Sequence, residues 1–115
     1  MENFEKLSDA IRAGSKKHRQ TFDWCDVETD KDGKIVRTSA IGAAIYACFG
    51  DIFLQGMADD NLKPIEALQE KFPFLKLKYG SGRETMTVAS RIEIYNHAGH
   101  WSREKIADWV EQFEK

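Results

Sequence analysis

Apolar residues recur every three or four positions at the start of the chain, and charged residues fill most of the positions between them. This spacing predicts an amphipathic helix over residues 4–14, with Asn3 as its N-cap. The helix would run into the basic segment Lys16-Lys17-His18-Arg19, whose cations complement the negative end of a helix dipole.

Two short runs with β-branched and aromatic residues come next, at residues 22–27 and 34–37. Asp30-Lys31-Asp32-Gly33 lies between them, and glycine at the left-handed position of a turn favours a β-hairpin. The same acidic residues match the start of an EF-hand calcium loop. However, the twelfth position of that loop is Ser39, which lacks the bidentate carboxylate that calcium needs, so the sequence favours the hairpin.

Residues 40–48 are mostly small and apolar, which predicts a central helix that other elements can approach closely. Thr38 or Ser39 would cap its start, and Gly50 would end or bend it. Apolar residues continue through residues 52–57, which predicts a further turn or short helix.

The second half of the chain carries clear start and stop signals. Pro64 suits the first turn of a helix, whose apolar pattern continues until Pro73. Leucines alternating with lysines predict a short edge strand at residues 74–79. Residues 88–95 suit a helix better than a strand, and Ser102 would cap a last amphipathic helix.

Together these elements predict a single globular domain over residues 1–115 that is mainly α, with four or five helices and a small β-hairpin. A compact single-domain α+β fold is the alternative, because residues 74–90 fit more than one kind of element. The chain is 42% hydrophobic and 31% charged, which is typical of a water-soluble protein with one buried core.

The net charge of -2 gives no overall field that would attract nucleic acid or anionic lipid, so any such binding must be local. The N-terminus has acidic residues where a signal peptide needs basic ones, and the longest uncharged run, residues 38–50, is too short to cross a bilayer. Cys25 and Cys48 are then typical of free thiols in a reducing compartment. We therefore expect a cytoplasmic protein that does not bind membranes.

Two motifs follow the N-terminal helix in an order that is familiar. The first is Ser39-Ala40-Ile41-Gly42-Ala43-Ala44-Ile45, and the second is Ile94-Tyr95-Asn96-His97 followed by Ser102-Arg103-Glu104-Lys105-Ile106. This arrangement resembles a family of short uncharacterised bacterial and phage domains, which pairs a Cys-Ala-Leu-Gly-Ala-like helix with an aromatic-Asn-Asp turn before the last helix.

The resemblance covers roughly half of the chain and implies a compact helical domain carried on phage or other mobile elements. The chain has Ser39 where the family tends to have cysteine, and His97 where the family tends to have aspartate. The family brings no established activity with it, so the resemblance bears on the fold more than on the function.

No catalytic constellation stands out in the sequence. His97 and His100 lie close enough around Gly99 to share a zinc or nickel ion, but no third ligand is evident, and such a pair is more often structural. Neither Cys25 nor Cys48 has a neighbouring signature that would activate a thiolate. We therefore assign no catalytic residues and expect neither a cofactor nor a bound metal.

Polar and aromatic groups are concentrated before the last helix, as is typical of a binding surface. Trp101 would pack over the last helix as a staple or stand exposed as an anchor, and the staple fits the sequence better. We predict a non-enzymatic protein-interaction or regulatory domain that binds a protein partner or a second copy of itself. The candidate surface consists of Tyr95, Asn96, His97, His100 and Trp101.

Two alternatives remain open. A nucleic-acid-binding regulator would use Lys16, Lys17 and Arg19, with an aromatic side chain stacking on a base. A domain with a small-molecule pocket, or a minor metal-dependent enzyme, would show itself first by metal bound at His97 and His100.

Overall fold

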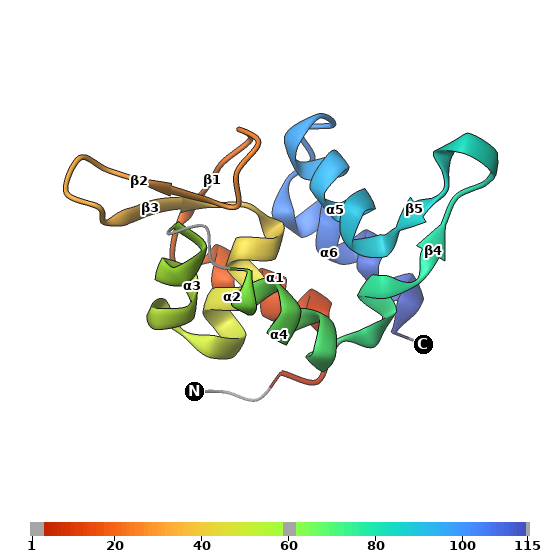
Figure 1. Ribbon diagram of the computed structural model, residues 1–115, viewed down its shortest axis with the longest axis horizontal. Coiled ribbons are helices and arrows are strands. Elements are labelled where there is room, and N and C mark those ends of the chain that lie inside the picture. Colours follow the sequence, from red (N-terminus) through yellow and green to blue (C-terminus); the bar gives the residue numbers. More distant parts are fainter. Residues whose placement is uncertain (1–3, 59–61, 115) are drawn as a thin grey trace.

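The computed structural model describes residues 4–58 and 62–114, and these ranges are mainly helical (Figure 1). The α-helices are α1 (Leu7–Ser15), α2 (Ala40–Phe49), α3 (Asp51–Ala58), α4 (Lys63–Lys71), α5 (Val88–His97) and α6 (Arg103–Val110). The strands are β1 (Arg19–Gln20), β2 (Val27–Thr29), β3 (Ile35–Thr38), β4 (Lys78–Tyr79) and β5 (Met86–Thr87). Three 3-10 helices complete the fold: η1 (Pro73–Lys76), η2 (Gly82–Glu84) and η3 (Glu111–Phe113).

The prediction of a mainly α fold with a small β component is confirmed. The described ranges hold six α-helices where the sequence predicted four or five. Helix α5 covers the segment for which the sequence favoured a helix over a strand. None of the helices in residues 4–58 and 62–114 combines the length and the apolar character that a membrane span requires.

Helix α2 lies at the centre of the fold, and most of its side chains are buried. Helices α1, α3, α4, α5 and α6 all contact it. Its small residues allow α1 to approach very closely, since a Cβ atom added at Gly14 would lie 1.8 Å from the carbonyl oxygen of Ala43. The close approach expected of this helix is therefore present as contact between two backbones.

Strand β3 lies between β1, with which it is parallel, and β2, with which it is antiparallel. The β2–β3 turn is the one predicted from the sequence. Asp30 Oδ1 accepts hydrogen bonds from the backbone N–H groups of Asp32 and Lys34, and Gly33 has a φ of 80°. The acidic segment thus forms a hairpin turn.

Serine side chains cap two helices; Ser102 is the cap that the sequence predicted, and Ser39 is one of the two candidates, Thr38 being the other. Ser39 caps α2 and Ser102 caps α6, and each hydroxyl accepts the backbone N–H three residues further on at 3.1 Å. Helix α1 starts after Lys6, while the predicted cap Asn3 lies outside the described residues.

Two predicted strands are shorter than the sequence pattern suggested. The run at 22–27 contributes only its last residue to β2, because residues 23–26 bend away from the sheet, with the N–H of Cys25 donating to the carbonyl of Asp23 at 2.7 Å. The run at 74–79 starts in η1, which turns Leu75 into the core, and only its last two residues pair with β5.

Replacing Gly14 by alanine should lower the free energy of unfolding by about 1–3 kcal/mol, because the added methyl group would collide with the backbone of Ala43. Urea unfolding followed by circular dichroism measures this change. The control is Asp9→Ala, at an exposed position of the same helix, which should change stability by about 0.5 kcal/mol or less. Wild-type stability in Gly14→Ala would contradict the backbone contact between α1 and α2.

Candidate functional site

The structure divides the predicted interaction surface between the core and the exterior. Tyr95, Asn96 and His97 form the end of α5, and Asn96 and His97 are 0% and 3% exposed. His100 is exposed and Trp101 is half-buried. From the sequence we expected these five residues to form one surface outside the helices, and this is wrong, because α5 continues through His97 and turns the Asn96 and His97 side chains inward.

Asn96 connects segments that are distant in sequence. Its Oδ1 accepts hydrogen bonds from the backbone N–H of Ala40 at 3.1 Å and from Gln20 Nε2 at 2.8 Å. Its Nδ2 donates to the carbonyl of Thr21 at 2.8 Å. Gln20 extends the network, since it also donates to the carbonyl of Trp101 at 2.8 Å. Asn96 therefore joins α5 to β1 and to the start of α2.

Tyr95 and Trp101 stack on each other, with ring centroids 4.1 Å apart and planes at 8°. Lys105 Nζ lies 4.2 Å from the centroid of the Trp101 ring. Trp101 is thus packed against protein groups on both sides and is not a projecting anchor.

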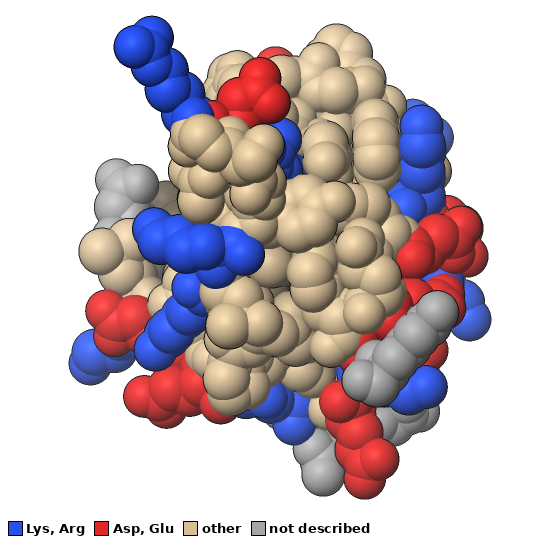
Figure 2. Space-filling view, turned by 90° about the vertical axis from the view of Figure 1, so that its right-hand side faces the viewer, with Lys and Arg blue, Asp and Glu red and all other residues tan. Residues whose placement is uncertain are grey.

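Trp109 of α6 packs edge-on against Tyr95, and Tyr79 of β4 and Phe113 of η3 pack against Trp109 in turn. Around β4 and β5, at the right of Figure 1, uncharged side chains cover the middle of the surface, and charged side chains lie mostly toward its edge (Figure 2). This face therefore offers a partner more aromatic packing than charge.

Three titratable side chains meet at His97. Asp26 Oδ1 lies 3.8 Å and Glu93 Oε2 lies 3.5 Å from His97 Nε2. Ser39, the cap of α2, donates its hydroxyl to Asp26 Oδ1 at 2.7 Å, and the Trp24 ring lies 5.1 Å from the His97 ring. Within the described part of the chain, this is the one group of three such residues whose ligand atoms lie within 4.8 Å of one another.

Burial disfavours the charged form of all three groups, whereas their contacts with neighbouring groups shift each pKa in a direction of their own. Burial raises the pKa of Glu93 to about 7. Burial also acts to raise the pKa of Asp26, but the contacts with His97 and Glu93 and the hydrogen bond from Ser39 outweigh it and lower that pKa. Burial acts to lower the pKa of His97, but Asp26 and Glu93 outweigh it and raise that pKa to about 9. The cluster therefore carries net negative charge once Glu93 ionises.

The composition of this cluster suggests a metal site, but the state of His97 does not fit one. Because the Asn96 carbonyl faces the Ala40 N–H, its amide nitrogen faces His97 Nδ1, at 3.2 Å. We therefore assign Nδ1 as the acceptor and Nε2 as the protonated nitrogen of the neutral ring. The imidazolium form carries protons on both nitrogens. A metal ion bound at Nε2 would need the ring proton on Nδ1, where it would face the Asn96 amide donor, so Asn96 opposes that form of the ring.

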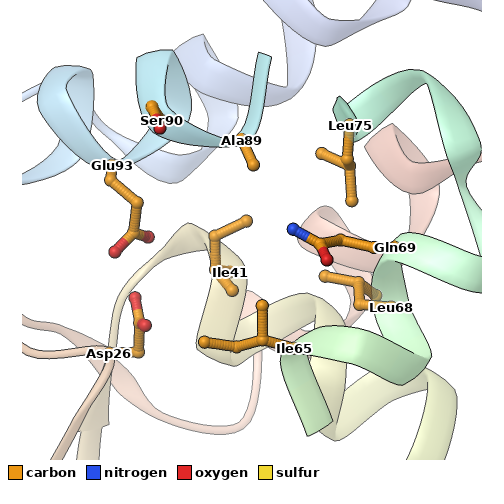
Figure 3. Close-up of a pocket in the computed structure, with 9 residues that line it drawn as sticks. All are labelled: Asp26, Ile41, Ile65, Leu68, Gln69, Leu75, Ala89, Ser90 and Glu93. Carbon is orange, nitrogen blue, oxygen red and sulfur yellow. The ribbon is translucent and has the colours of Figure 1, made fainter. Parts of the chain in front are cut away.

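A pocket of about 110 Å³ opens beside the cluster, lined by α2, α4, η1 and α5 (Figure 3). The carboxylates of Asp26 and Glu93 point toward each other at one end of it. Apolar side chains form the rest of the wall: Ile41, Ile65, Leu68, Leu75 and Ala89, with the polar Gln69 and Ser90 between them.

Helix α3 leaves most of its surface uncovered. Of its described side chains only Leu54 is buried. We use the name α3 patch for the large apolar side chains that α3 and the neighbouring groove leave uncovered or half-covered: Trp24, Ile52, Phe53, Met57 and Leu62. Ile52 is 87%, Trp24 69% and Leu62 66% exposed. A groove of about 530 Å³ passes between Trp24, Met57 and Leu62.

The basic residues predicted for nucleic-acid binding lie beside the sheet. The parallel pairing of β1 with β3 sets Arg19 opposite Arg37. Lys17 and Lys34 lie along the same groove of about 450 Å³, which we call the basic groove. Lys16 is exposed next to it in sequence but does not line it.

Both cysteines are free thiols, as the sequence predicted. Burial raises the pKa of Cys25, which is half-buried, and the pKa of Cys48, which is buried. A raised pKa disfavours the reactive thiolate, so neither residue is an activated nucleophile.

The sequence pattern did not predict Asp26 and Glu93 as site residues. One signal was present, because Glu93 and His97 are four residues apart and share a face once residues 88–97 are helical. Asp26 had no such signal, since it reaches His97 only through the packing of the 22–26 loop against α5.

The chain matches no family model, and neither a curated protein nor a solved structure is significantly similar to it.

Asn96→Ala should lower the free energy of unfolding by about 2–4 kcal/mol, because it leaves the buried backbone groups of Ala40 and Thr21 without a partner. Urea unfolding measures the loss. Gln112→Ala, which removes one exposed hydrogen bond to the carbonyl of Trp109, is the control and should be close to neutral. If Asn96→Ala were as stable as Gln112→Ala, the network would not hold α5 in place.

Proposed function

We propose that this chain is a non-enzymatic protein-interaction domain that associates with a second copy of itself through the α3 patch. The observation that carries the proposal is the exposure of Ile52, at 87%, on a helix that buries only Leu54 among its described side chains. Contiguous exposed apolar side chains are a signature of interaction surfaces, and tryptophan and methionine are enriched there.

The chemistry of the patch supports a second copy as the occupant. A two-fold interface places the same surface against itself, so a strongly charged patch would repel its own copy. The α3 patch contains no charged residue, and among the described residues Asp51 lies on the same helix and Asp26 lines the groove; Asp59 and Asp60, between Met57 and Leu62 in the sequence, lie outside the described residues. The groove beside Trp24 offers a concave surface that could receive Ile52 or Phe53 of the other copy.

Ile52→Lys should convert a dimer into a monomer, or weaken the dimer by at least about tenfold, because it places two ammonium groups in an apolar interface. Light scattering coupled to gel filtration, at low and high salt, measures the mass. Leu77→Lys is the matched control, since Leu77 is 57% exposed and follows η1, outside the α3 patch. A monomeric wild-type chain, or an Ile52→Lys variant that stays dimeric, would contradict the proposal.

The basic groove supports a second candidate function, binding to the phosphate backbone of nucleic acid. The β1–β3 register brings Arg19 and Arg37 together, and Lys17 and Lys34 extend the positive surface although the whole chain is acidic. Arg37 is also paired with Glu28, with 2.9 Å between Nη1 and Oε2, so Lys17, Arg19 and Lys34 would make most of the phosphate contacts.

A Lys17→Ala, Arg19→Ala double variant should bind single- and double-stranded oligonucleotides more weakly than the wild type. It should also release about two fewer counterions on binding, which flattens the dependence of affinity on salt concentration. Fluorescence anisotropy over a series of salt concentrations measures both effects. The Lys76→Ala, Lys78→Ala variant removes the same charge outside the groove and should behave as wild type. The candidate would be abandoned if the wild-type chain did not bind, or if both double variants lost affinity equally.

A further inference from the structure

The pocket beside Asp26 and Glu93 combines an apolar wall with an acidic end (Figure 3). Of its lining residues, only these two can ionise, and both are acids. An engineered cavity of about 150 Å³ holds a benzene molecule, so a pocket of about 110 Å³ suits a somewhat smaller apolar group. The ligand expected from the shape of the pocket is a short aliphatic chain.

The acidic end is incompletely satisfied. Glu93 Oε1 is buried and has no hydrogen-bond partner in the described part of the protein. His97 has a side chain only 1% exposed, and its Nε2 also lacks a partner at hydrogen-bond distance there. The His97 Nε2–H group faces Asp26 Oδ1 and Glu93 Oε2, which leaves Glu93 Oε1 for another donor.

The cluster is neutral while Glu93 is protonated, because Asp26 and the imidazolium form of His97 then balance, and it becomes negative as Glu93 ionises. With both carboxylates ionised, even the imidazolium form of His97 leaves one net negative charge. A buried negative charge is stable only if it is paired with a cation or hydrogen-bonded. We infer that this pocket binds an alkylammonium ion, with its –NH₃⁺ group between Asp26 and Glu93 and its aliphatic chain against Ile41, Leu68 and Ala89.

Other ligand classes fit the pocket less well. Both carboxylates would repel an anion, and Asn96 opposes the form of the His97 ring that a metal ion at Nε2 needs. A neutral alcohol of the same length would fill the apolar part without compensating the negative charge. The alkylammonium group alone satisfies the shape, the charge and the free acceptor at Glu93 Oε1.

Binding should become tighter as the pH rises through the Glu93 pKa of about 7, because the ionised carboxylate is the form that holds the ammonium group. The charged groups that face Glu93 are Asp26, from the loop before β2, and His97, on α5; α2, α4 and η1 contribute no titratable residue to the pocket. A primary amine has a pKa near about 10 and stays protonated over this range.

The test is a titration of the full chain with butylammonium chloride, followed through the methyl NMR signals of Ile41, Leu68 and Ala89. We expect saturable shifts of these signals and binding that strengthens as the pH rises through about 7. Glu93→Gln should weaken binding by at least about tenfold and remove the pH dependence. Glu70→Gln, which removes an exposed carboxylate of α4, should bind as wild type.

Two further controls separate charge from shape. n-Butanol should bind at least about tenfold more weakly than butylammonium, because it lacks the positive charge. Ala89→Leu should block binding by filling the pocket while leaving both carboxylates in place. This variant also keeps the inference testable if Glu93→Gln does not fold.

The ammonium group could belong to a free amine or to a lysine side chain, and Nα-acetyl-lysine methylamide distinguishes them. Tighter binding of the lysine derivative than of butylammonium would assign the pocket to a lysine of a partner, and the reverse order would assign it to a free amine. Ile52→Lys should bind butylammonium normally, so a failure of self-association leaves this inference standing. Absence of saturable shifts, or equal affinity in the wild type and Glu93→Gln, would overturn it.

Discussion

The position of α5 depends on the side-chain amide of Asn96. Its oxygen and nitrogen satisfy backbone groups of Ala40 and Thr21, which would otherwise be buried without partners. The same amide faces His97 Nδ1 and thereby sets which nitrogen of the neutral ring carries the proton. A contact that stabilises the fold therefore also determines the chemistry of the cluster that His97 forms with Asp26 and Glu93.

The small residues of α2 allow this arrangement to form. With Gly14 against Ala43, α1 comes close enough to cover one side of α2, while α4 and α5 pack on other parts of it and enclose the acidic pocket. Ser39 contributes to the helix and to the cluster: its hydroxyl accepts the Gly42 N–H as the cap of α2 and donates to Asp26. The segment 39–45 thus supports the core and one side of the cluster.

Although the net charge of the chain is only -2, the protein has one locally positive region and one locally negative region. Arg19 and Arg37 are paired in register beside the sheet, whereas Asp26 and Glu93 face each other beside the core. The basic groove is open to solvent, where salt screens its charges. The acidic pair is largely buried, where charges interact more strongly and protonation is shifted. The two surfaces therefore suit ligands of opposite charge.

The sequence by itself determined the last helix with its cap Ser102, the helix that starts near Pro64, and the turn at Gly33, because these features depend on neighbouring residues; it left the cap of α2 open between Thr38 and Ser39. It did not reveal the burial of Leu75 or the inward turn of Asn96 and His97, since their surroundings come from other segments. Asp26 meets His97, and Arg19 meets Arg37, only after packing and strand pairing bring distant segments together. Local periodicity specifies an element and its faces, whereas tertiary packing decides what each face covers and which charges become neighbours.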